Sequence, residues 1–101
     1  MVSALRINVR QDDLLRQMLA AGLDVVRSFR GSRNWLLVRD GSADHQQLLT
    51  LEDLGCVYRG CCRIRGFCCF HATQLGCDVV GMTWGETEKA LRHAERNRSL
   101  V

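Results

Sequence analysis

The chain has 101 residues, of which 47% are apolar and 25% are charged, and its formal net charge is +3. This balance excludes a disordered, fibrous or low-complexity chain, and the length suits one domain with one hydrophobic core. We therefore expect a single α+β domain over residues 1–101. Apolar runs fall well short of the roughly 20 residues that cross a bilayer, and the N-terminus lacks the order of a secretory signal, so a cytoplasmic protein without membrane contact is expected.

The N-terminal part of the chain predicts a strand, a helix and a hairpin. Apolar and polar residues alternate from Ala4 to Arg10, which is the period of a half-buried strand. The segment Asp12 to Ala21 places its apolar residues on one helical face and is followed by a glycine, so it predicts a helix. Two β-rich stretches, Leu23 to Arg30 and Trp35 to Arg39, flank a turn over residues 31–34 and predict a hairpin.

The middle of the chain is harder to assign. Asp44 to Leu54 fits a short helix, whereas Gln46 to Leu51 alone could be a strand, and the helix is favoured. Cys56 to Ala72 is rich in cysteine, aromatic and β-branched residues and predicts two or three short strands with a turn near Gly66. Cys77 to Met82 predicts another strand.

The C-terminal segment predicts a helix. Thr83 to Glu86 has the Thr-x-x-Glu form of a capping box, and the following apolar residues recur on one helical face. The whole order of elements is compatible with a small single-domain sandwich that has a ferredoxin-like βαββ(α)β core, a cysteine-rich β extension and a C-terminal helix.

Six cysteines lie between Cys56 and Cys77. Because no oxidising compartment is indicated, buried thiols, metal ligands or redox groups explain them better than structural disulfides. Reduced buried thiols are the favoured interpretation, since free cysteine behaves as a small apolar residue. Zinc stays open as an alternative, because only Cys56-x4-Cys61 and Cys68-x2-His71 approach the usual ligand spacing.

Adjacent cysteines in a strand point to opposite faces of the sheet. One thiol of each adjacent pair is therefore expected in the core and the other nearer solvent. If Arg65-Gly66 forms a two-residue hairpin turn, Cys62 falls opposite Cys69, close enough for a disulfide. Cys62 and Cys69 are on that condition a possible redox pair.

Thirteen of the fourteen basic residues are arginine, and they are unevenly distributed. Residues 25–39 and 55–77 contain seven arginines and no acid. Arginine suits phosphate because its planar fork donates two parallel hydrogen bonds, and aromatic residues between the arginines could stack on bases. The alternative is that the arginines only solvate an exposed sheet and deter edge pairing. The candidate nucleic-acid-binding residues are Arg27, Arg30, Arg33, Arg39, Arg59, Arg63, Arg65 and Trp35.

Motifs that carry catalysis are missing from the sequence. It contains no Gly-x-Ser-x-Gly elbow, phosphate-binding loop, dinucleotide fingerprint or His-x-x-x-His metal helix. The three histidines are scattered, with His45 near a turn and His93 on the polar side of the last helix, so surface roles are expected. We therefore predict a protein that is not an enzyme and that uses no cofactor.

Two short stretches resemble a toxin and an antitoxin family. Ala21 to Arg33 is similar to the helix-to-hairpin passage of HicA-type ribonuclease toxins, which carry their catalytic histidine just after Gly-Ser, where this chain has Arg33. Leu75 to Glu86 resembles the strand-to-helix passage of HicB-type antitoxins. Each stretch covers less than a fifth of the chain, and neither assigns it to a family.

The sequence favours a small non-catalytic binding protein that engages nucleic acid or a nucleoprotein through an arginine-bearing sheet surface. A protein-binding regulator or inhibitor of the kind that mobile elements encode, acting through a homodimer or a partner interface, is one alternative. A zinc-stabilised or thiol-sensing module is another. A homodimer is expected.

Overall fold

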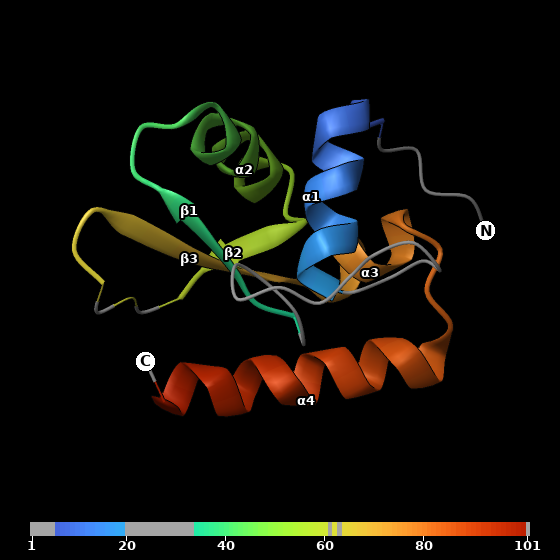
Figure 1. Cartoon of the computed structure of the whole chain (residues 1–101). Helices are drawn as coiled ribbons and strands as arrows, with labels where there is room; N and C mark the ends of the chain where they lie inside the picture. The colour runs from blue at the N-terminus through green and yellow to red at the C-terminus, as the bar shows by residue number, and fades with distance from the viewer. Residues whose placement is uncertain (1–5, 20–33, 61, 63, 101) are drawn as a thin grey trace.

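A computed structural model describes residues 6–19, 34–60, 62 and 64–100 (Figure 1). Within them the elements follow the order α1 (Val9–Leu19), β1 (Leu36–Arg39), α2 (Ala43–Asp53), β2 (Val57–Arg59), β3 (Phe67–Ala72), α3 (Gln74–Val79) and α4 (Trp84–Leu100). The described part of the chain is thus an α+β fold with four helices and three strands. None of its helices has the length and apolar character needed to cross a membrane.

The three described strands form an antiparallel sheet in the order β1-β3-β2. Leu36 lies opposite Phe70, and Val57 lies opposite Ala72. Alternate residues therefore point to opposite faces of the sheet, and one face carries apolar side chains along all three strands. That face belongs to the main core, which it builds with Leu36, Val38, Val57, Phe70 and Ala72.

Helices cover both faces of this sheet. α1 and α2 lie side by side on one face, and α4 runs along the other (Figure 1). The first two helices complete the main core with the buried residues Leu14, Leu15, Met18, Leu48 and Leu51. Leu37 and Cys69, which face each other across β1 and β3, are buried on the opposite face. The order of layers is helix pair, sheet, helix.

Asn34 continues the pairing of β1 with β3 two residues beyond Leu36. Its side chain occupies the register site opposite Ala72, donating to the Ala72 carbonyl (3.0 Å) and accepting from the Ala72 amide (2.5 Å). Its own backbone has a positive φ of 61° and donates to the carbonyl of Met18 at the end of α1. The fully buried Asn34 side chain thus makes the two hydrogen bonds to Ala72 that a strand backbone would make. The Asn34 backbone amide bonds instead to the end of α1.

The strand predicted over Ala4 to Arg10 is wrong for its described residues, because Arg6 to Asn8 has no regular structure and Val9 begins α1. The helix starts early because Asn8 and Gln11 cap it reciprocally. Asn8 Oδ1 accepts from the Gln11 amide (2.7 Å), and Gln11 Oε1 accepts from the Asn8 amide (3.0 Å). This Asn-x-x-Gln capping box outweighs the apolar alternation before it.

The strand predicted over Cys77 to Met82 is also wrong, since this region forms the end of α3 and the turn after it. Thr73 caps that helix by accepting from the Gly76 amide (3.2 Å). Gly76 lies so close to the backbone carbonyl of Cys56 that a Cβ there would overlap it. Local capping and this close contact outweigh the weak strand preference of the two valines that follow.

The other predicted elements agree with the structure where it describes them. α1 confirms the described part of the predicted first helix and starts three residues earlier, while Ala20 and Ala21 lie outside the described residues. α2 shows that the 44–54 segment is a helix, with Leu54 as its C-cap. β2 and β3 flank a turn at Gly66 as expected, and Thr83 caps α4 by accepting from the Glu86 amide (3.3 Å). Leu23 to Arg30 lies outside the described residues. The ferredoxin-like arrangement is not confirmed, because the described sheet has three strands and the described residues before α1 form none.

Candidate functional site

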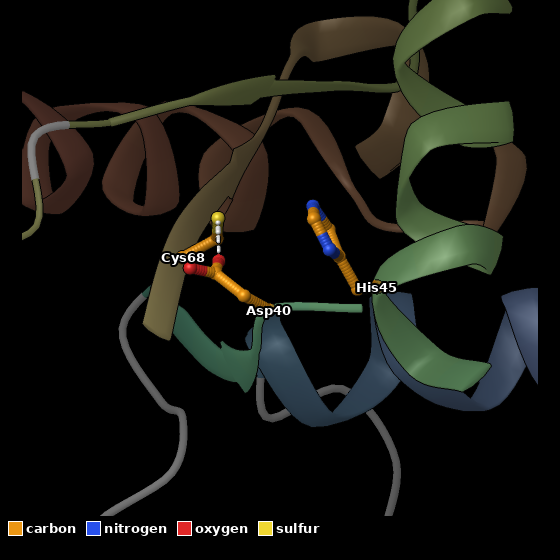
Figure 2. A group of neighbouring side chains, drawn as sticks. All are labelled: Asp40, His45 and Cys68. Carbon is orange, nitrogen blue, oxygen red and sulfur yellow. Dashed lines mark hydrogen bonds between the residues drawn. The ribbon is translucent and has the colours of Figure 1, made fainter. Parts of the chain in front are cut away.

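Three ligand-type side chains from different elements converge at one end of the sheet. Asp40 directly follows β1, His45 lies in the first turn of α2, and Cys68 lies near the start of β3 (Figure 2). Their ligand atoms all lie within 4.8 Å of one another, and no other such group of His, Cys, Asp or Glu occurs in the described residues. We call Asp40, His45 and Cys68 the ligand cluster.

The turn between β1 and α2 holds two members of the ligand cluster in place. Ser42 caps α2, accepting from the His45 amide (3.2 Å) while its hydroxyl donates to the Arg39 carbonyl (2.7 Å). The Asp40 amide donates to the carbonyl of Gly66 (2.9 Å), which joins this turn to the β2–β3 turn. Backbone and capping bonds thus fix Asp40 and His45 relative to β3.

Cys68 donates its thiol hydrogen to Asp40 Oδ1 over 2.6 Å (Figure 2). Partial burial, this hydrogen bond and the charge of the carboxylate raise the pKa of the Cys68 thiol to about 11. The thiol is therefore protonated at neutral pH. Because the thiolate is the nucleophilic form, the arrangement does not activate Cys68 for covalent catalysis.

His45 has one satisfied and one unsatisfied ring nitrogen. Its Nδ1 accepts from the Gly41 amide (2.9 Å), so in the neutral ring the proton is on Nε2. Nε2 is buried and has no hydrogen-bond partner among the described residues. The His45 ring packs against the Phe70 ring, with 6.0 Å between the two ring centroids. A buried ring nitrogen without a partner is costly in a structural histidine, so this position is a candidate for ligand binding.

Of the two pairs with zinc-like spacing, Cys68 and His71 are not brought together. Cys68 faces α2 and Asp40, whereas His71 lies on the opposite face, fully buried, with its Nδ1 2.7 Å from the carbonyl oxygen of Asn34. A strand separates the side chains of residues three apart in this way. Cys56 is buried in the core, and Cys61 lies outside the described residues.

No disulfide joins any two of the five described cysteines, and three of them, Cys56, Cys69 and Cys77, are buried. Cys68 and Cys69 show the expected division between a half-buried and a buried thiol. The geometry behind the Cys62–Cys69 pair is not formed, because the amide of Gly60 bonds to the Cys69 carbonyl (2.9 Å) and places Gly60 opposite it. The Phe67 amide donates to the Ile64 carbonyl (3.2 Å), so Arg65 and Gly66 lie at the centre of a β-turn, but the register of β2 and β3 does not place Cys62 opposite Cys69.

The candidate arginines divide among several places. Arg39 and Arg65 are exposed at the sheet end formed by the β2–β3 turn, and the Arg39 guanidinium carbon lies 5.9 Å from the centroid of the Phe67 ring. Arg59 points to the α2 side and pairs with Glu52 (3.0 Å). Half-buried Trp35 lies at the opposite end of β1. The remaining candidates, Arg27, Arg30, Arg33 and Arg63, lie outside the described residues.

Arg39 and the ligand cluster occupy the two faces of the same sheet end. Arg39 lies opposite Phe67 in the register, and the next residues along the two strands, Asp40 and Cys68, point to the other face. No spacing along the chain indicates the ligand cluster in advance. Its members are separated by long segments, and only the β1–β3 pairing and the capped start of α2 bring them together.

Comparison with known proteins finds no matching family, no matching curated protein and no matching solved structure. The segment that resembles HicB-type antitoxins forms α3 and the start of α4, where the resemblance implied a strand followed by a helix. The segment that resembles HicA-type toxins lies outside the described residues.

Proposed function

We propose that the chain is a non-catalytic binding protein that engages nucleic acid, alone or within a nucleoprotein, through the sheet end carrying Arg39, Arg65 and Phe67. The Arg39 guanidinium carbon lies over the Phe67 ring, 5.9 Å from its centroid, and this contact beside exposed Arg65 carries the proposal. A guanidinium held over an aromatic ring keeps its N–H donors available for other partners. Such donors suit the paired oxygens of a phosphate.

The surroundings of this sheet end support an anionic partner. Residues 55–77 contain no acid, so the β2–β3 turn adds no repulsion towards phosphate. Ile64 is 51% exposed in the same turn and offers an apolar contact to a base or a sugar. Asp40 is the acid nearest in sequence to Arg39, but its side chain points to the other face and accepts from Cys68.

The experiment is fluorescence anisotropy of the full chain with labelled single-stranded RNA and DNA of mixed sequence, over increasing salt. Binding through phosphates releases counterions, so log K should fall linearly with log salt by about 0.7 for each phosphate contacted. Binding that is absent at low salt, or insensitive to salt, contradicts the proposal. A stable homodimer that binds neither oligonucleotide would instead favour the protein-binding regulator.

A further inference from the structure

We propose that Asp40, His45 and Cys68 bind one divalent transition-metal cation, with zinc as the cation whose preferences they match. This inference is independent of nucleic-acid binding, because none of these three side chains belongs to the Arg39–Phe67 surface. The donor set combines a sulfur, a ring nitrogen and a carboxylate oxygen. Magnesium and calcium prefer oxygen donors alone, whereas zinc takes all three types.

The distances between the ligand atoms are close to those of a tetrahedral zinc site. Metal–ligand bonds of roughly 2.0 to 2.3 Å at tetrahedral angles place ligand atoms roughly 3.3 to 3.8 Å apart. The Cys68 Sγ to Asp40 Oδ1 distance is 2.6 Å, and no pair in the cluster exceeds 4.8 Å. Shifts of about 1 Å or a little more therefore suffice, which side-chain rotation supplies without moving the backbone.

Two features of the ligand cluster favour a cation over a purely structural role. An ionised carboxylate and a thiolate would repel at 2.6 Å, so either a proton or a cation must lie between them. The buried Nε2 of His45 has no partner among the described residues beside them. A cation bound by Nε2 would replace the shared proton and give that ring nitrogen a partner.

Binding changes the protonation of the cluster in a defined way. The S–H bond of Cys68 breaks, its proton passes to solvent, and a sulfur–metal bond forms in place of the hydrogen bond to Asp40. A ligating ring nitrogen must present a lone pair, and in the metal-free chain that lone pair lies on Nδ1 and accepts from Gly41. Ligation by Nδ1, or by Nε2 after its proton has moved to Nδ1, removes the Gly41 hydrogen bond. We therefore expect weaker binding than at a structural zinc site with four protein ligands.

The fourth coordination position faces outwards, because Asp40 is exposed and the other two ligands are half-buried. Three protein ligands with an open position allow a water molecule to complete the tetrahedron. The site adjoins the β2–β3 turn through the bond between the Asp40 amide and the Gly66 carbonyl. A bound cation would thus hold that turn against the start of α2.

The test is a titration of the metal-free full chain with cobalt(II), which reports a thiolate ligand by charge-transfer absorption and tetrahedral geometry by intense visible bands. We expect one cobalt per chain with both features, and displacement by zinc. Cys68→Ser should remove the charge-transfer absorption, and the control Cys62→Ser, at a half-buried thiol outside the cluster, should keep it. No charge-transfer absorption in the unchanged chain, or the same absorption in Cys68→Ser, overturns the proposal.

Asp40→Asn provides a second variant in case Cys68→Ser does not fold. Asp40 is exposed, so its substitution leaves the core packing intact. Removal of a ligand should weaken cobalt binding by at least the roughly 10- to 100-fold that is typical of removing an outer partner. The control Asp53→Asn alters an exposed carboxylate at the end of α2 and should bind like the unchanged chain. Equal affinity of Asp40→Asn and the unchanged chain also overturns the proposal.

Discussion

The Cys68 thiol donates to Asp40 Oδ1 across 2.6 Å, joining the second residue of β3 to the turn that follows β1. Together with partial burial, this contact raises the pKa of the thiol to about 11. Without a cation, Cys68 is therefore a protonated and unreactive thiol. The same contact keeps the carboxylate next to the sulfur and leaves the pair ready to exchange its proton for a metal ion.

Asp40→Asn is predicted to make metal-free Cys68 more reactive towards iodoacetamide. The carboxylate disfavours the thiolate by its charge and by accepting the thiol hydrogen, and asparagine removes the charge. The pKa of Cys68 should fall, so the thiolate fraction and the alkylation rate at mildly alkaline pH should rise. Peptide mass spectrometry over time measures the rate, with Asp53→Asn as the control. An unchanged or slower rate in Asp40→Asn would show that the carboxylate does not control this thiol.

Stability is predicted to fall as the pH rises from about 9 to about 11, the ordinary and the folded-state pKa of Cys77. Cys77 is fully buried, and burial is the main cause of its raised pKa. In this window the unfolded chain releases the thiol proton while the folded chain keeps it, so raising the pH favours unfolding. Below the window both states are protonated, and Cys77 adds no pH dependence. The decrease in stability is on the order of 2 kcal/mol for a shift of this size.

Urea unfolding at several pH values measures this decline. In Cys77→Ala the decline should become smaller, although Cys56 and Cys68, whose pKa values are also raised, keep part of it. An identical decline in the variant and the unchanged chain would mean that Cys77 does not titrate as described.

Asn34→Ala is predicted to destabilise the fold by about 2 to 4 kcal/mol, because it leaves the buried amide and carbonyl of Ala72 unpaired. It also places alanine at a φ of 61°. Asn34→Gly removes the same two hydrogen bonds but accepts the positive φ, so it should be less destabilising by about 1 kcal/mol. Chemical denaturation of the three proteins measures both effects. If either variant is as stable as the unchanged chain, the Asn34–Ala72 contact does not hold β1 to α1 and β3.

Gly76→Ala is predicted to destabilise the fold by about 1 to 3 kcal/mol, because the new methyl group would overlap the Cys56 carbonyl that α3 packs against. Gly85→Ala is the matched control, since it lies in the first turn of α4 with nothing within 4 Å of the new Cβ. The control should be neutral or stabilising by up to about 1 kcal/mol, from the higher helix propensity of alanine. Thermal unfolding compares the two, and equal effects would contradict the close approach of α3 to Cys56.

Local sequence patterns correctly predicted the elements that a nearby cap or turn determines. The Thr83–Glu86 capping box located the start of α4, and the turn at Gly66 separated β2 from β3. The same reasoning failed where two local patterns competed. Asn8 and Gln11 form a capping box, but the alternation of apolar and polar residues around them predicted a strand. Thr73 caps α3, but Val79 and Val80 later in that segment favoured a strand.

The ligand cluster could not be predicted, because the tertiary fold, and no local sequence pattern, brings its three residues together. The spacing of the cysteines pointed to ligands within residues 56–77. The partners of Cys68 are instead Asp40, which follows β1, and His45, in the first turn of α2. The burial of His45 Nε2 could not be predicted either, because it depends on tertiary packing such as the contact of the ring with Phe70. Sequence spacing finds ligands that share one turn, and here each of the three comes from a different element.

Nucleic-acid binding by the sheet end with Arg39 and Arg65 is tested most directly by comparing the salt dependence of binding between two variants. The double variant Arg39→Ala/Arg65→Ala should bind single-stranded RNA and DNA more weakly and lower the slope of log K against log salt by about 0.7 for each phosphate that it no longer neutralises. Arg92→Ala, which removes an exposed arginine on α4, should leave both nearly unchanged. Equal affinities and slopes for the two variants would contradict the proposed surface.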